Sequence, residues 1–164
     1  MCRRAGGLVH GILSDGTWEW DAVAAPAPGS GQVLTPGSVE IAGYQVPVVA
    51  FQRLQPFEDP DTGTIGTAWS RVELATRTKA GAWTLETIAS AGDGYAPVGG
   101  PDLTGWGPSV TVDSNGGTHV VFADLASWTD ANETPRLEPG GVRYAWRSGP
   151  GAFRIRTVLA QRFD

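Results

Sequence analysis

The sequence predicts an all-β fold, and three features of its composition and patterning indicate it. The chain contains 23 glycines and 12 prolines among 164 residues, enough to supply a turn after every short segment. Its seven tryptophans, with many valines and threonines, are residue types that favour extended strands. Short runs in which apolar and polar residues alternate are typical of strands with one buried face. We therefore expect many short strands joined by turns.

Charge, hydropathy and cysteine content exclude several classes of protein. The net charge is −5 and no cluster of lysine and arginine is present, which argues against a nucleic-acid partner. The longest apolar run, Val46 to Phe51, is far shorter than the roughly 20 residues of a membrane-spanning helix, so no membrane insertion is expected. Cys2 is the only cysteine, which excludes an internal disulfide and a cysteine-based zinc site. No signal peptide is visible, because no apolar run follows the initial MCRRAGG.

An internal repeat organises the chain. The segment VELATRTKAGAWTLETIA (72–89) aligns without a gap to VRYAWRSGPGAFRIRTVL (142–159), and LVHGILSDGTWEWDAVA (8–24) is a third copy. Upstream of the two complete copies, GSVEIAGYQVPVVAFQ (37–52) aligns with PSVTVDSNGGTHVVFAD (108–124). The second alignment matches Pro47 with His119, Val48 with Val120 and Val49 with Val121. The two complete copies start 70 residues apart, at Val72 and Val142. A period of this length indicates a repeated supersecondary unit.

Each complete unit is predicted to hold four antiparallel strands. We expect them near 37–42, 45–52, 70–78 and 82–89, and again near 108–113, 118–124, 141–148 and 152–159. Four such strands recurring at a fixed period are the signature of a β-propeller blade. The sequence thus predicts a partial β-propeller, with a leading half blade of two strands in 1–24 and full blades in 25–90 and 91–164.

This blade count leaves a propeller incomplete. Closed propellers contain typically about four to eight blades. Further blades would come from the same longer chain, which is the interpretation we favour, or from other copies of this chain. A conventional β-sandwich is the alternative fold.

The two blade segments resemble a known repeat group. PSVTVDSNGGTHVVFAD and GGVRYAWRSGPGAFRIRTV are similar to the blades of secreted bacterial β-propellers of the broad sialidase-like (BNR-type) group. The resemblance implies an extracellular or cell-surface location. It does not extend to the sialidase box Ser-x-Asp-x-Gly-x-x-Trp, which SDGTW and DSNGG only approach. Sialidases of this group are expected to carry three arginines, a tyrosine with a glutamate partner and an acid/base aspartate, and no residues here assemble that set.

Long connections mark the candidate binding face. Connections 53–69 and 125–140 within blades, and 25–36 and 90–107 between blades, are predicted to emerge on one face. Aromatic rings stack on sugars while arginine and carboxylate groups bind hydroxyls. The predicted ligand-binding residues are Trp69, Trp106, Trp128, Arg53, Arg71, Asp124 and Asp130. The alternative is that each tryptophan only anchors its own loop.

Neither a calcium site nor a catalytic histidine is expected. Asp59 and Asp61 in DPDTGTIG have the spacing of a calcium loop, but Gly63 stands where a third ligand is normally found. A Pro-Asp-Gly turn is the favoured interpretation, and no cofactor is expected. His10 and His119 are too few and too separated to predict catalysis.

The sequence therefore predicts a non-enzymatic β-propeller segment of a larger exported or surface protein, which binds carbohydrate or protein through its long-loop face. The alternatives are the non-catalytic part of a sialidase-like glycoside hydrolase, and a self-assembling propeller lectin. Trp18 and Trp20 lie two residues apart in the last strand of the half blade. They are predicted to pack against a neighbouring blade rather than to bind a ligand.

Overall fold

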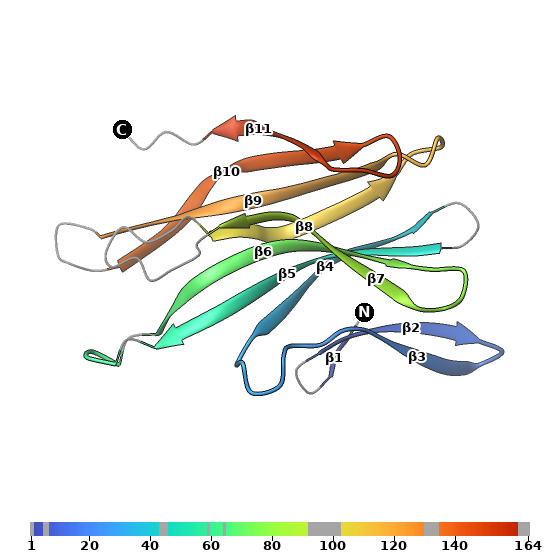
Figure 1. Ribbon diagram of the computed structural model, residues 1–164, viewed down its shortest axis with the longest axis horizontal. Coiled ribbons are helices and arrows are strands. Elements are labelled where there is room, and N and C mark those ends of the chain that lie inside the picture. The colour runs from blue at the N-terminus through green and yellow to red at the C-terminus, as the bar shows by residue number, and fades with distance from the viewer. Residues whose placement is uncertain are drawn as a thin grey trace.

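The protein is built entirely from antiparallel β-sheets. The computed structural model describes residues 2–4, 7–42, 46–58, 60–63, 65–91, 103–129 and 135–160. Within these ranges eleven strands form three sheets, which follow one another along the molecule in chain order (Figure 1). The described ranges hold no helix long and apolar enough to cross a membrane.

Each sheet is a meander of sequential strands. The N-terminal sheet holds β1 (Cys2–Arg4), β2 (Gly7–Ser14) and β3 (Thr17–Ala24). The middle sheet holds β4 (Val33–Ala42), β5 (Val46–Glu58), β6 (Ile65–Arg77) and β7 (Trp83–Ala91). The C-terminal sheet holds β8 (Leu103–Val112), β9 (Thr118–Thr129), β10 (Pro135–Arg147) and β11 (Arg154–Ala160). The all-β antiparallel fold is confirmed. The described strands do not close into a ring, so the propeller stays a prediction, and β1 is a short strand that the sequence analysis did not anticipate.

The repeat is structural as well as sequential. In each sheet the last strand carries one extra residue opposite the strand before it, a β-bulge that increases the local twist. The bulged residues are Val23, Ile88 and Val158, which the sequence alignment had placed at one position. The three sheets therefore share a backbone irregularity as well as an apolar pattern.

The alignment of the second strands was wrong by one residue. The structure pairs Val49 with Ala75 and Val120 with Ala145, so Val49 rather than Val48 corresponds to Val120. The sequence alignment had given 108–124 one residue more than 37–52. The structure needs no such extra residue, because the first hairpins of the two sheets have equal length, with Ile41 opposite Pro47 and Val112 opposite Thr118. A shift of one residue moves every side chain to the other face of the sheet, so the correction decides which residues face which neighbour.

Two apolar layers hold the three sheets together. Between the N-terminal and middle sheets lie Leu8, Val23, Leu34, Val49, Phe51 and Ala75. Between the middle and C-terminal sheets lie Val48, Ala50, Val72, Leu74, Ile88, Val110, Val120, Phe122 and Ala145. The middle sheet is covered on both faces. This explains why β5 begins with the continuous apolar run of the sequence rather than with an alternating pattern.

One ion pair recurs between successive sheets. Arg77 of the middle sheet lies 2.6 Å from Asp21 of the N-terminal sheet. Arg147 of the C-terminal sheet lies 2.5 Å from Glu86 of the middle sheet. Arg77 matches Arg147 and Asp21 matches Glu86 in the repeat alignment. The same contact is therefore used twice in the same direction along the chain.

The predicted long loops are largely strand. β5 and β6 remain paired out to Glu58 and Ile65, and β9 and β10 out to Thr129 and Pro135. Segments 53–69 and 125–140 are therefore not loops along their whole length. Pro56 lies within β5 but beyond Leu54, the last residue of β5 on the side that pairs with β4, so no β4 partner needs the missing N–H of the proline.

Trp18 and Trp20 lie together but are not packed. Their rings stack at 5.4 Å between centroids, on the face of the N-terminal sheet that points away from the middle sheet. The two residues are 55% and 49% exposed. The predicted pairing on one face is correct, whereas burial by a neighbouring sheet is not found among the described strands, because none of their sheets covers that face.

Candidate functional site

The structure separates the residues that the sequence had grouped as a binding site. Trp69 and Arg71 lie in β6, Arg53 in β5, Trp106 in β8 and Asp124 in β9. Asp59, Asp130 and the side chain of Trp128 lie outside the described residues. The five described candidates come from strands rather than loops, and among them Arg53 and Arg71 lie directly opposite each other across β5 and β6.

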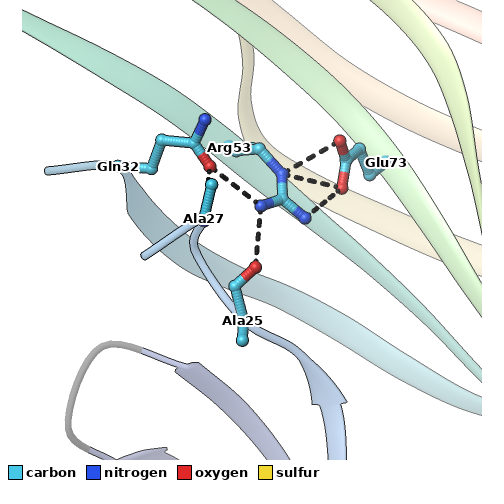
Figure 2. Close-up of polar contacts among 5 residues, drawn as sticks. All are labelled: Ala25, Ala27, Gln32, Arg53 and Glu73. Carbon is cyan, nitrogen blue, oxygen red and sulfur yellow. Dashed lines mark hydrogen bonds and ion pairs between the residues drawn. The ribbon is translucent and has the colours of Figure 1, made fainter. Parts of the chain in front are cut away.

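Arg53 is engaged by the scaffold. Its Nε donates to both carboxylate oxygens of Glu73 at 3.0 and 3.1 Å, and one terminal nitrogen lies 3.0 Å from the same group. The other terminal nitrogen donates to the carbonyl of Ala25 at 3.0 Å and to Oε1 of Gln32 at 3.1 Å (Figure 2). The Arg53 and Glu73 side chains are only 11% and 9% exposed. Arg53 thus attaches the connection after β3 to the middle sheet.

Asp124 has the corresponding role in the C-terminal sheet, with the charges reversed. Phe51 lies opposite Glu73, and the matching Phe122 lies opposite Arg143. Arg143 donates to Asp124 at 3.3 Å, and the Thr104 hydroxyl donates to the other carboxylate oxygen at 2.6 Å. An aspartate–arginine pair here replaces the arginine–glutamate pair of the middle sheet.

A buried polar network joins β8 to the middle sheet, and the sequence analysis did not predict it. The Gln52 side-chain amide donates to the carbonyl of Thr104 at 2.8 Å, and the Thr104 N–H donates to the Ser70 hydroxyl at 2.7 Å. All three residues are buried. A signal was present, since Gln52 ends the apolar run of β5, and a polar residue there needs a partner.

Trp69 and Arg71 are the two candidates whose side chains are in contact, and Arg53 lies directly opposite Arg71 across the strand pair. They lie two residues apart on one face of β6, and the Arg71 guanidinium carbon is 4.3 Å from the centroid of the Trp69 ring. Both residues are half-buried. Across the strand pair, Gln55 faces Trp69 and donates to the carbonyl of Ser30 at 2.8 Å, which positions the preceding connection beside them. Among the described residues no carboxylate lies within ion-pair distance of Arg71.

Trp106 does not belong to the same surface. It is exposed and lies opposite Ala123, on the face of the C-terminal sheet that points away from the middle sheet. Trp69 shares its face of β6 with Ala75, which packs toward the N-terminal sheet. Two sheets therefore separate the surfaces to which the two tryptophans belong.

His119 bridges two polar partners. Its Nε2 lies 3.0 Å from the Asp113 carboxylate, and its Nδ1 lies 2.6 Å from the hydroxyl of Tyr144. The hydrogen bond from His119 lowers the pKa of Asp113, and the backbone N–H groups of Gly117 and Asn115 add to the effect. The predicted hairpin turn at 113–117 is thereby linked to β10. This arrangement fits the structural role that the sequence suggested for His119.

Shallow hollows occur at the opposite end from the predicted face. One of about 460 Å³ is lined by Val46, Pro47 and the turn 77–81. The other, of about 350 Å³, lies at the equivalent turn 146–152. Both are open to solvent at the short turns between third and fourth strands of their sheets.

The segment with calcium-loop spacing is described only in part. Asp61 is exposed in the turn after β5, and its proposed companion Asp59 lies outside the described residues. In the part of the chain that the structure describes, no three His, Cys, Asp or Glu side chains converge as metal ligands do.

Comparison with protein-family models, with curated proteins and with solved structures gave no match. Support for a function therefore comes from the chain's own geometry.

Proposed function

We propose that this chain forms part of a β-propeller in an exported or cell-surface protein, and that it binds an acidic carbohydrate without catalysis. The observation that carries the binding proposal is the Arg71 guanidinium stacked on Trp69. The proposal includes no catalytic step: the Glu73 and Asp124 carboxylates are paired with arginines and are not assigned as an acid or a base.

Three repeated features support the propeller part of the proposal. The sheets are successive four-stranded meanders in the two complete units, each with the same bulge. The contact from one sheet to the next also repeats, as the Asp21–Arg77 and Glu86–Arg147 pairs demonstrate. A contact repeated in one direction builds either an open stack or a closed ring of units, and the ring is the arrangement of propeller blades.

The chemistry of the Trp69–Arg71 pair favours a ligand with a carboxylate. A guanidinium held over an indole still carries N–H groups in a fork that can donate in parallel to two oxygens of one carboxylate. The indole holds the arginine in place, which lowers the entropy lost on binding. The apolar edge of Trp69 adds a surface for sugar C–H groups. Acidic sugars combine these two features.

The experiment compares glycans that carry a carboxylate with their methyl esters, using isothermal titration of the full chain. A hydrogen bond to a charged group contributes about 1.5–3 kcal/mol, so Arg71→Gln is expected to weaken binding by about 10- to 100-fold. Trp69→Ala is expected to weaken it as well, because Arg71 loses its support. Lys79→Gln removes one cation from the opposite end of the sheet and is the matched control.

Two results would overturn the binding proposal. One is unchanged affinity in Arg71→Gln. The other is equal affinity for the carboxylates and their methyl esters, since an esterified group cannot accept a charge-assisted pair of hydrogen bonds.

A further inference from the structure

The two ends of the sheet stack expose apolar faces that no described sheet covers. The outer N-terminal face carries Leu13, Trp18 and Trp20 on β2 and β3, with Leu13 directly opposite Trp18. The outer C-terminal face carries Val121, Val158, Tyr144, Trp146 and Arg156 on β9, β10 and β11. These two groups of residues lie on opposite sides of the molecule, since the middle sheet separates the sheets that carry them (Figure 1).

The outer C-terminal face repeats a surface that the chain buries elsewhere. The bulged residue is 4% exposed at Val23 and 8% at Ile88, where another sheet follows, but 60% at Val158. Similarly, Ala50 is fully buried, while Val121 at the equivalent position is 43% exposed. The same strand positions are thus covered where a next sheet is present and uncovered where it is absent. The occupant that fits is another sheet of the same kind.

The charges indicate which sheet fits. In both internal contacts an acidic residue, Asp21 or Glu86, meets an arginine of the next sheet. Arg156 occupies the corresponding position on the outer C-terminal face, aligned with Glu86 in the repeat. A neighbour carrying an arginine like Arg77 would place two cations together, which costs free energy.

The outer N-terminal face avoids this repulsion. Leu13 lies opposite Trp18 as Arg77 lies opposite Trp83, so a leucine replaces the arginine there. Arg156 already lies 5.4 and 5.6 Å from the ring centroids of Tyr144 and Trp146, and Trp18 would add a further aromatic surface for it. Both outer faces are therefore largely apolar, and the residues named on the N-terminal face bring no cation opposite Arg156.

We propose that the outer N-terminal face of one copy of this chain docks onto the outer C-terminal face of a second copy, head to tail. The inference rests on the propeller part of the proposed function. Each copy supplies three sheets, so two copies bring six, within the roughly four to eight blades of closed propellers. Closure with two copies satisfies both outer faces of each.

The test is the mass of the full chain in solution, measured by light scattering and sedimentation. The expected particle contains two chains. Trp18→Glu and Val158→Glu each place a charge in one face only and are expected to give single chains with unchanged circular dichroism, since both positions are more than half exposed. An equal mixture of the two variants keeps one intact pair of faces, so a two-chain species is expected to reappear. Ser114→Glu, at an exposed turn position between β8 and β9, is the matched control and keeps the parent mass.

A parent chain that is monomeric at its highest soluble concentration would overturn the inference. So would Trp18→Glu or Val158→Glu variants that keep the parent mass, or a mixture of the two variants that remains monomeric. Titration of the acidic glycan on the same samples separates the two proposals. If the chain is monomeric and its affinity for the glycan falls in Arg71→Gln, only the docking of a second copy is contradicted. If the chain is dimeric and Arg71→Gln leaves the glycan affinity unchanged, only the glycan site is contradicted.

Discussion

The sharpest stability prediction concerns the Arg53–Glu73 pair. Arg53→Met keeps an unbranched apolar stem but removes every donor that Arg53 now supplies to Glu73, Ala25 and Gln32. Glu73 is then left as a carboxylate with 9% of its side chain exposed and no opposite charge beside it. Water can replace the donor at Ala25, where the hydrogen bond is exposed, but it cannot solvate Glu73 without opening the sheet contact.

The magnitude follows from this burial. Removing one partner of a buried ion pair costs about 3–5 kcal/mol, and the remaining exposure of this pair places the expected loss near the lower end, at about 3 kcal/mol. That is a large part of the roughly 5–15 kcal/mol by which a domain is usually stable. Replacing both partners, as in Arg53→Met with Glu73→Leu, removes the stranded charge. The double variant is therefore expected to lie within about 1 kcal/mol of the parent.

Urea unfolding monitored by tryptophan fluorescence measures these free energies, with all variants compared at one protein concentration because self-association adds to apparent stability. The swapped variant, Arg53→Asp with Glu73→Arg, reproduces the order of the Asp124–Arg143 pair and is expected to recover part of the loss. A single Arg53→Met variant that costs less than about 1 kcal/mol, as an exposed pair would, would refute the reasoning.

Two further predictions address packing and pH. Gly37→Ala would drive a Cβ into the carbonyl oxygen of Pro108 and to 2.8 Å from the carbonyl oxygen of Ala50, so we expect a stability loss of at least about 1–3 kcal/mol, measured by thermal unfolding. Gly66→Ala is the control, because open space surrounds Gly66, and it is expected to be neutral or slightly stabilising. Equal effects of the two substitutions would contradict the close approach of β4 and β8. Burial, followed by the charge of Arg77, lowers the pKa of His10 below its usual 6.5. The unfolded chain therefore binds a proton at His10 more readily than the folded chain, and the stability contributed by neutral His10 is lost as pH falls below about 6.5. His10→Phe is expected to flatten the pH dependence of unfolding between about pH 7 and 5, and a slope that persists unchanged in that variant would assign it to other groups.

Strand existence and order were predictable from local pattern, but strand ends were not. Alternation and turn residues placed all four strands of both complete units. The extension of β5 through Pro56 was missed, because whether a proline interrupts a strand depends on whether a neighbour needs its N–H, and only the pairing of β4 and β6 answers that.

The candidate site was less predictable than the fold. Residue type made Arg53, Arg71 and Asp124 equally plausible ligand contacts. Only tertiary pairing showed that Arg53 holds Glu73 and that Asp124 holds Arg143, while Arg71 lies on Trp69. Such pairs join residues about 20 positions apart, and a single sequence does not distinguish an arginine with a partner from one without.

The amino-acid sequence by itself determined the repeat, the four-strand unit and the placing of Trp18 and Trp20 on one face, because alternation along a strand sets which side chains share a face. Only the tertiary structure decided which of those faces is covered. Val23, Ile88 and Val158 occupy one position of the repeat, yet the first two are buried and the third is exposed. Burial requires a neighbouring sheet, and the sequence of one strand does not indicate whether that sheet is present.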